Sequence, residues 1–266
     1  MKQTSNSKKI LTKKEPEKRL LLNLKEKAGR SNSGRITVRH RGGGVKKLYR
    51  IIDFGQEKIG VEGHLIAIEY DPNRSAFIML IEYSDGDKRY QIAPNGIEIG
   101  EKVICDEKAD PKTGNRMRLD NIPSGTQVYN IELIPNNGGK IVRSAGTSAL
   151  IAAKEGKYCN LLMPSKEVRK VPVKCFASIG QVSRPEKRFE KITNAGAKRR
   201  MGWRPVNRGS SMNPCDHPHG GGEGRAPIGL SYPKTPWGKP AKGVHTRRRK
   251  STQKYIINRR STNKKK

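Results

Sequence analysis

The sequence has few aromatic residues and no long apolar stretch. Aromatic residues make up 5% of the 266 residues, and hydrophobic residues of all kinds make up 33%. No stretch approaches the roughly 20 consecutive apolar residues that a membrane-spanning helix needs. The composition therefore excludes a membrane-spanning protein, and it predicts that part of the chain is ordered only by contact with a partner.

Paired cysteines and a secretory signal are also missing. The first 20 residues contain no apolar core of a signal peptide, and Glu15 and Glu17 argue against an organellar transit peptide. The four cysteines are Cys105, Cys159, Cys175 and Cys215. No two of them form a C-x-x-C pair, so the sequence indicates neither a zinc ribbon nor a disulfide framework. We expect reduced thiols in an intracellular, non-secreted protein.

Positive charge is what the sequence has in excess. The chain has 56 Lys and Arg residues against 24 Asp and Glu residues, a net charge of +32. Residues 1–59 carry +12 and residues 184–266 carry +19, whereas residues 60–183 carry only +1. A polyanion with dense phosphates offsets such repulsion most naturally. We expect residues 60–183 to fold alone and the two basic arms to need the partner.

Short apolar runs separated by turn residues begin near Gly60. Pro, Asn, Asp and Gly stand between the first runs, and these residue types favour turns. Helices are predicted only at 20–28 and 185–196. The runs predict strands at 63–71, 76–84, 88–94, 101–106, 126–135, 140–146, 149–156, 158–164, 167–173 and 176–183.

This spacing predicts a mostly β protein with two consecutive small barrels. We place the barrels at 60–125 and 126–195. A basic N-terminal extension (1–59) precedes them, and a basic, Gly- and Pro-rich C-terminal extension (196–266) follows. Both extensions are expected to be long and irregular.

A basic, glycine-rich loop at 34–54 is the first candidate binding site. Gly42, Gly43 and Gly44 let the backbone approach a phosphate without a Cβ, and the surrounding Arg side chains can bind phosphate with two hydrogen bonds. The G-K-[ST] ending of a nucleotide-binding P-loop is missing. The loop therefore indicates contact with an RNA backbone, with a solvated basic linker as the alternative.

A second candidate lies at 196–214. Trp203 stands between Arg200 and Arg204, and an aromatic ring among Arg side chains suits stacking on an unpaired base. The alternative is that Trp203 is a local packing anchor. The C-terminal run from Lys242 is a further basic arm, and its alternative is a solvated tail.

Residues 213–229 combine potential metal ligands with glycines. Pro214 and Pro218 predict an extended path, in which residues one apart point to opposite sides, and a glycine run offers no rigid scaffold for catalysis. A glycine-rich loop packed against RNA is therefore favoured. A metal-dependent hydrolase stays as an alternative because potential ligands fall within nine residues, namely Cys215, Asp216, His217, His219 and Glu223.

Five motifs, in order, resemble one protein family. From about Gly34 to Arg260 the sequence resembles the bacterial-type large-subunit ribosomal protein L2 family, in its bacterial, mitochondrial or plastid form. It departs from the family pattern at Cys215, where Val is usual, at Val45, where His is frequent, and before Gly34. The motifs are RHRGGG (39–44), EYDPNRSA (69–76), SAGT (144–147), MNPCDHPHGGGEGR (212–225) and TPWGKPAKG (235–243).

The resemblance implies an OB-like barrel followed by an SH3-like barrel, in a structural constituent of the large ribosomal subunit that binds rRNA. It also implies roles in subunit association, tRNA binding and the architecture of the peptidyl transferase region, with His217 tied to competence for peptidyl transfer. The implied partners are large-subunit rRNA, neighbouring ribosomal proteins and, through an intersubunit bridge, the small subunit, with no membrane. The implied location is a ribosome in an organelle, a mitochondrion before a plastid, or in the bacterial cytoplasm.

We expect no catalytic residue, no metal-binding residue and no cofactor beyond Mg²⁺ associated with RNA. A DNA-architectural protein is the remaining alternative. The expected RNA-binding residues are Arg35, Arg39, Arg41, Gly42, Gly43, Gly44, Lys46, Lys47, Arg50, Arg74, Lys198, Arg199, Arg200, Trp203, Arg204, Arg208, Asn213, Asp216, His217, His219, Gly220, Gly221, Gly222, Arg225, Trp237, Arg247, Arg248 and Arg249.

Overall fold

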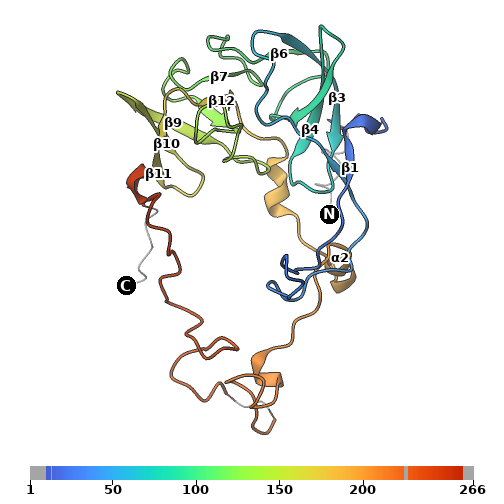
Figure 1. Cartoon of the computed structure of the whole chain (residues 1–266), viewed down its shortest axis with the longest axis vertical. Helices are drawn as coiled ribbons and strands as arrows, with labels where there is room; N and C mark the ends of the chain where they lie inside the picture. Colours follow the sequence, from blue (N-terminus) through green and yellow to red (C-terminus); the bar gives the residue numbers. More distant parts are fainter. Residues whose placement is uncertain (1–9, 13, 225–226, 260–266) are drawn as a thin grey trace. The chain divides into compact units, whose positions relative to one another are not determined.

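The computed structural model describes residues 10–12, 14–224 and 227–259, and most of their regular structure is β (Figure 1). The strands form three antiparallel sheets. The prediction of a mostly β protein is therefore confirmed. None of the helices among the described residues is long and apolar enough to cross a membrane.

The strands are short, and the helices are shorter still. The strands are β1 (Leu21–Asn23), β2 (Leu48–Arg50), β3 (Glu62–Tyr70), β4 (Phe77–Tyr83), β5 (Lys88–Ile92), β6 (Lys102–Ile104), β7 (Arg116–Arg118), β8 (Gln127–Tyr129), β9 (Ala149–Glu155), β10 (Tyr158–Leu162), β11 (Val168–Pro172), β12 (Phe176–Ile179) and β13 (Ile256–Asn258). The helices are η1 (Lys18–Leu20), η2 (Pro185–Phe189), α2 (Ala195–Arg200), η3 (Gly209–Ser211) and η4 (Gln253–Tyr255).

The chain divides into two compact units. Unit 1 comprises the described parts of Met1–Leu24, Lys47–Lys191 and Thr252–Lys266, and it contains all three sheets. Unit 2 comprises Lys25–Lys46 and the described part of Ile192–Ser251, and it contains α2 and η3. Each unit thus combines segments that are far apart in the sequence.

Strand β4 is buried on both faces of a four-stranded sheet with the order β5-β4-β3-β6. Ile78 and Leu80 pack into one apolar cluster. Phe77, Met79 and Ile81 pack into another on the opposite face, because successive side chains of a strand point to opposite sides. Burial of both faces explains why the sequence of this strand is continuously apolar and does not alternate.

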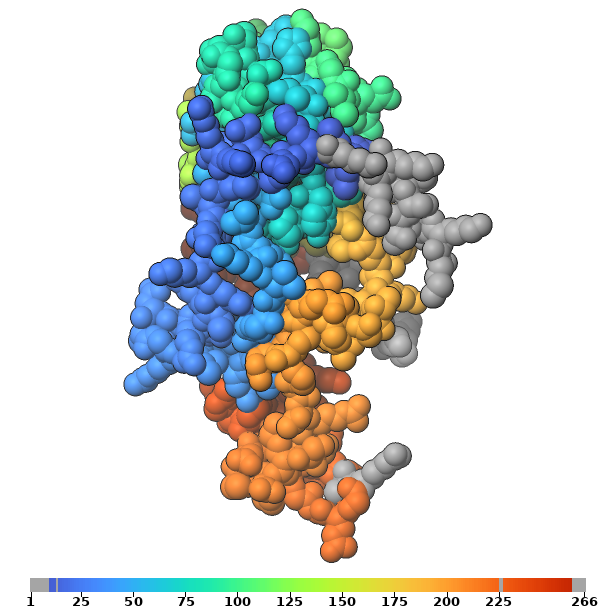
Figure 2. Space-filling model, turned by 90° about the vertical axis from the view of Figure 1, so that its right-hand side faces the viewer, coloured from blue at the N-terminus to red at the C-terminus, as the bar shows by residue number. Residues whose placement is uncertain are grey.

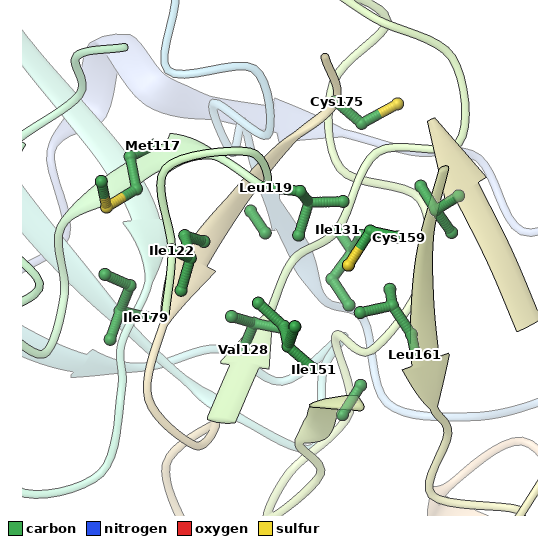
Figure 3. Packing of buried hydrophobic residues seen from close by; sticks show 13 residues of the cluster. Met117, Leu119, Ile122, Val128, Ile131, Ile151, Cys159, Leu161, Cys175 and Ile179 are labelled. Atoms are coloured by element: carbon green, nitrogen blue, oxygen red, sulfur yellow. The ribbon is translucent and has the colours of Figure 1, made fainter. Parts of the chain in front are cut away.

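A second sheet surrounds a separate apolar core. Its seven strands have the order β13-β11-β10-β9-β8-β12-β7. Leu119, Ile151 and Leu161 are fully buried within this core, which Figure 3 shows from close by. Near the C-terminus, β13 pairs with β11 through Ile256 and Asn258. Part of the expected irregular C-terminal extension is therefore a strand of unit 1.

Nine of the ten predicted strands are present; β3 is shifted by one residue from the predicted 63–71, and the other eight are shorter than predicted. The tenth prediction, at 140–146, was wrong, because Ile141 forms only an isolated bridge with Ile131 there. The helix predicted at 20–28 was also wrong: Leu21–Asn23 is strand β1, paired with β2. The helix predicted at 185–196 is replaced by η2 and the start of α2. The sequence did not indicate β2, β7 or β13.

A buried ion pair lies at the centre of unit 1. The Arg116 Nη2 atom lies 3.0 Å from Glu132 Oε1, and the two side chains are 0% and 2% exposed. Arg116 also donates to the carbonyl oxygen of Asn130, and Glu132 accepts the backbone N–H groups of Asn136 and Phe176. The pair thus joins β7 to residues 130–136, which precede β9, and to Phe176, the first residue of β12. These hydrogen bonds offset part of the cost of burying the two charges.

We predict that Glu132→Gln destabilises unit 1 by about 3 kcal/mol, because the Arg116 guanidinium would stay buried without a counter-charge. The free energy of unfolding in urea measures the effect. Glu107→Gln is the matched control, since its partner Arg118 is partly exposed, and it should cost less than about 1 kcal/mol. Equal losses in the two variants would contradict the assignment.

Three of the four cysteines are buried thiols. Burial raises the pKa of Cys105 to about 12, of Cys159 to about 11 and of Cys175 to about 12. A thiol reacts as its thiolate, so these three are protonated and unreactive near neutral pH. Cys215 is exposed.

The native protein should therefore react with iodoacetamide at one thiol, that of Cys215, and the unfolded protein at all four. Mass spectrometry of the alkylated chain counts the modified residues. In Cys215→Ser, native labelling should vanish while labelling after unfolding falls to three thiols. Rapid native modification of Cys159 would show that the second core is open to solvent.

Candidate nucleic-acid interface

Unit 2 carries most of the uncompensated charge. Its two segments, 25–46 and 192–251, contain 20 Lys and Arg residues and three Asp and Glu residues, a net charge of +17. The 47–191 segment of unit 1 has 23 basic and 19 acidic residues. Unit 2 therefore has the excess of positive charge that favours association with dense phosphate.

The glycine-rich loop and the segment after α2 are bound to each other. Gly42 donates its N–H to the Gly202 carbonyl oxygen at 2.9 Å, and Val45 donates to the Arg200 carbonyl oxygen at 3.0 Å. Arg204 donates back to the carbonyl oxygen of His40 at 3.1 Å. In Figure 2 the blue atoms of this N-terminal part touch the orange atoms of the α2 region. The first two candidate sites thus form one surface.

The surroundings that favour glycine differ among the three positions of the loop, Gly42, Gly43 and Gly44. A Cβ on Gly44 would lie 3.0 Å from the Gly202 nitrogen, and a Cβ on Gly42 would lie 2.9 Å from the Cβ of Ala28. These two positions are small because the chain packs against itself. Gly43 has φ +68°, and its nearest neighbour would be Arg199 Nη1 at 4.0 Å. Close approach to a phosphate, expected for all three, is a reason that fits Gly43.

Trp203 is covered on one face by an arginine of the loop. The guanidinium carbon of Arg41 lies 3.2 Å from the centroid of the Trp203 ring, and the two residues form an isolated β-bridge. This geometry supports the packing-anchor interpretation, in which the ring also holds Arg41 at the surface. Trp237 is more exposed, at 73% against 42% for Trp203, and Arg39 lies 5.1 Å from its ring.

Helix α2 presents three consecutive basic residues. The Asn194 side chain accepts the N–H of Ala197 at 2.7 Å and so caps the first turn. Lys198, Arg199 and Arg200 form the last turn, where positive charge is favoured by the helix dipole. Lys198 and Arg200 are exposed. The cap therefore fixes where these charges stand.

Residues 212–221 form a compact turn, so the predicted extended path was wrong. The carbonyl oxygen of Asn213 accepts the N–H groups of Asp216 and His217, and Gly220 donates to the His217 carbonyl oxygen at 2.8 Å. A Cβ on Gly220 would lie 2.3 Å from the Asn213 carbonyl oxygen. Here glycine is required by the turn itself.

The two histidines of this turn lie side by side and not on opposite sides. Their ring centroids are 4.6 Å apart. The N–H of His219 donates to His217 Nδ1 at 3.0 Å, and the N–H of Lys234 donates to His219 Nε2 at 2.8 Å. In this network Nδ1 of His217 and Nε2 of His219 are the acceptors of backbone N–H groups. His217, 7% exposed, is thus oriented by a backbone partner that the sequence did not reveal.

Most expected RNA-binding residues belong to unit 2, but three do not. Lys47, Arg50 and Arg74 are in unit 1. Arg74 is bonded to Asp71 and to the Tyr49 hydroxyl, each at 2.9 Å. Arg225 lies outside the described residues. Exposed basic residues of unit 2 that the expectation omitted are Lys25, Lys27, Arg30, Lys239, Lys242 and Lys250, and their charge alone could have indicated them.

The sequence matches two families that together cover most of the chain. Residues 17–105 match the RNA binding N-terminal domain of ribosomal proteins L2, and residues 112–238 match the C-terminal domain of the same proteins. The chain belongs to the ribosomal protein L2 family. It is accordingly a structural protein of the large ribosomal subunit that binds rRNA and takes part in translation, and it is not an enzyme.

Membership of the L2 family decides between the functions that the sequence left open. It selects rRNA binding over the two alternatives, a metal-dependent hydrolase and a DNA-architectural protein. Among the described residues, no group of three or more His, Cys, Asp or Glu side chains is placed so that it could hold a metal ion. Asp216 and Glu223 are exposed and lie outside the histidine network.

We predict that the His217→Gln variant of this L2 protein supports the assembly of large ribosomal subunits better than the His217→Ala variant. A Gln side chain offers an oxygen that can accept the His219 N–H and an N–H that can donate, whereas Ala leaves that donor unpaired, at a cost of about 1–3 kcal/mol. Reconstitution of large subunits, scored separately from peptide-bond formation, measures the difference. If both variants assemble normally and only the pH profile of peptide-bond formation changes, a positioning role for His217 is excluded.

Proposed function

We propose that unit 2 is the principal rRNA-binding element of this L2 protein. The observation that carries the proposal is its charge of +17, with only three acidic residues among 82. The hydrogen bonds between the 42–45 loop and the 200–204 segment support it, because they hold Arg41, Lys198 and Arg200 on one continuous surface. Phosphate contacts from these side chains would position the protein on folded rRNA.

We propose that the sheets of unit 1 are an OB-like barrel at 60–125 and an SH3-like barrel at 126–195. The enclosed cluster between β3, β4 and Val103 of β6 supports the first barrel. The cluster beneath β8 to β12 supports the second, and β7 (Arg116–Arg118), although it precedes residue 126, belongs to that same sheet. In this proposal the barrels are the scaffold from which the basic extensions reach the rRNA, and the scaffold folds without it.

We propose that the 212–221 turn acts in the peptidyl transferase region, and that the protein supports subunit association and tRNA binding. The oriented His217 ring supports this role, because a backbone N–H group holds it in one orientation within the turn. Neighbouring ribosomal proteins and the small subunit, through an intersubunit bridge, are the proposed further partners. An organelle, a mitochondrion before a plastid, is the proposed compartment, with the bacterial cytoplasm as the other possibility.

Binding to large-subunit rRNA tests the proposal through its salt dependence. The slope of log K against log[salt] is negative. We expect its magnitude to decrease by about 2 to 3 when Arg247, Arg248 and Arg249 are all changed to Gln, because each lost phosphate contact lowers that magnitude by about 0.7 to 0.9. Point changes are preferable to deleting the C-terminal arm, because Ile256–Asn258 is strand β13 of unit 1. Filter binding at several salt concentrations measures the slope.

The matched control removes the same charge from unit 1. Lys108, Lys112 and Lys157 are exposed there, and changing all three to Gln should leave the slope within about 0.5 of the unchanged protein. Equal effects of the two triple variants would show that only net charge matters. Equal affinity for duplex DNA and for rRNA would contradict an RNA-specific role.

A further inference from the structure

One stretch of this basic protein is acidic. Residues 51–112 contain 13 Asp and Glu residues and seven Lys and Arg residues, a net charge of −6 within a chain of +32. The stretch includes strands β3 to β6 of unit 1. Phosphate is repelled by such a surface, so RNA is not the partner that it suits.

Carboxylates outnumber cations at one end of the four-stranded sheet. Arg89 Nη1 lies 2.9 Å from Asp53 Oδ2 and 3.5 Å from Glu57 Oε2, and Arg89 Nε lies 2.9 Å from Asp87 Oδ2. Lys58 pairs with both Asp85 and Asp87. Four carboxylates therefore share two cations, which leaves a local charge of −2.

Glu57 is the carboxylate with the weakest internal partner. Its side chain is 81% exposed, and its ion pair with Arg89 is the longest of the three that Arg89 makes. Asp53, by contrast, is 11% exposed and also accepts the backbone N–H groups of Gly55 and Gln56. Asp53 thus holds the loop in shape, whereas Glu57 is free to bind an incoming cation.

A cavity of about 750 Å³ opens beside these carboxylates, entirely within unit 1. Its lining includes apolar side chains, among them Ile52, Phe54 and Phe176, and more carboxylates than cations, namely Asp53, Glu57, Asp87 and Glu132 against Lys88 and Arg89. This volume is in the range of sites that bind a whole ligand. The combination of apolar side chains and an excess of carboxylates suits a long side chain that is apolar along its stem and positive at its end.

We propose that this cavity binds a lysine- or arginine-rich segment of a neighbouring protein of the large subunit. The methylene stems of such side chains would pack against Ile52 and Phe54, and their charged ends would meet Glu57 and Asp87. Charge complementarity selects this occupant over RNA. The proposal rests on the proposed partnership with ribosomal proteins for its biological setting, and on the cavity and its charges for the site.

A defined peptide tests the site in the full-length protein. The probe is a fluorescein-labelled nonapeptide of alternating Lys and Leu, and the readout is fluorescence anisotropy at low ionic strength, where surface charges are least screened. We expect Glu57→Gln to weaken binding about threefold and Glu57→Lys about tenfold. Both changes are at an exposed residue, so the fold is retained.

The matched control places the same charge changes elsewhere. Glu155 is exposed at the end of β9 and is absent from the cavity wall. Glu155→Gln and Glu155→Lys should leave peptide affinity within about 1.5-fold of the unchanged protein. If the Glu155 variants weaken binding as much as the Glu57 variants, the peptide responds to net charge alone and the proposal is overturned.

A photocrosslinker at position 57 tests the site in assembled large subunits. An adduct to a Lys- or Arg-rich segment, mapped by peptide mass spectrometry, supports the proposal. An adduct to rRNA, or the absence of any polypeptide adduct, overturns it. Filter binding of the Glu57→Lys protein to rRNA separates the peptide-binding cavity from the proposed rRNA-binding function. If the rRNA affinity is unchanged, the proposed function stands, whatever the peptide experiments show at this cavity.

Discussion

The hydrogen bonds between residues 42–45 and 200–204 are the constraint on which the basic part of the molecule depends. Two segments about 160 residues apart, both strongly positive, repel each other, and their backbone groups nevertheless bind one another directly. The close approach needs Gly42 and Gly44, where a side chain would meet backbone or Ala28. Residues 25–46 of the N-terminal extension and 196–251 of the C-terminal extension are therefore parts of one folded unit and not two independent arms.

The division of charge along the chain follows from two different kinds of stabilisation. Unit 1 is held by apolar clusters and by the Arg116–Glu132 pair, and its 47–191 segment is nearly balanced in charge. Unit 2 has few fully buried apolar side chains among its described residues and a charge of +17. We expect its conformation to be favoured most when phosphate neutralises that charge, which would couple rRNA binding to the ordering of unit 2.

The fold was predictable where local pattern and tertiary burial agree. The apolar run of β4 and the alternating runs around it correctly indicated strands. Leu21–Asn23 resembled a helix in composition, but pairing with β2 overrode that weak local preference. Strand β13 was missed because its apolar residues, Ile256 and Ile257, lie in a basic segment with no periodicity. Long-range pairing of this kind leaves no local signal.

The geometry of the candidate site was not predictable from the sequence, and the role of its residues in RNA binding stays a prediction. Motifs and charge identified the 39–44 loop and the 212–225 segment, whereas proline content suggested the wrong path for the latter. His217 and His219 are joined because a backbone N–H from one residue satisfies the ring of the other, and only the closed turn brings them together. The surroundings of the glycines were also not predictable from the sequence. A Cβ on Gly43 would meet no close neighbour, whereas Gly44 packs against Gly202 and Gly220 packs against Asn213. A glycine-rich motif therefore does not tell by itself what each glycine does, because the contact partner of each glycine decides whether a substitution disturbs the fold of unit 2.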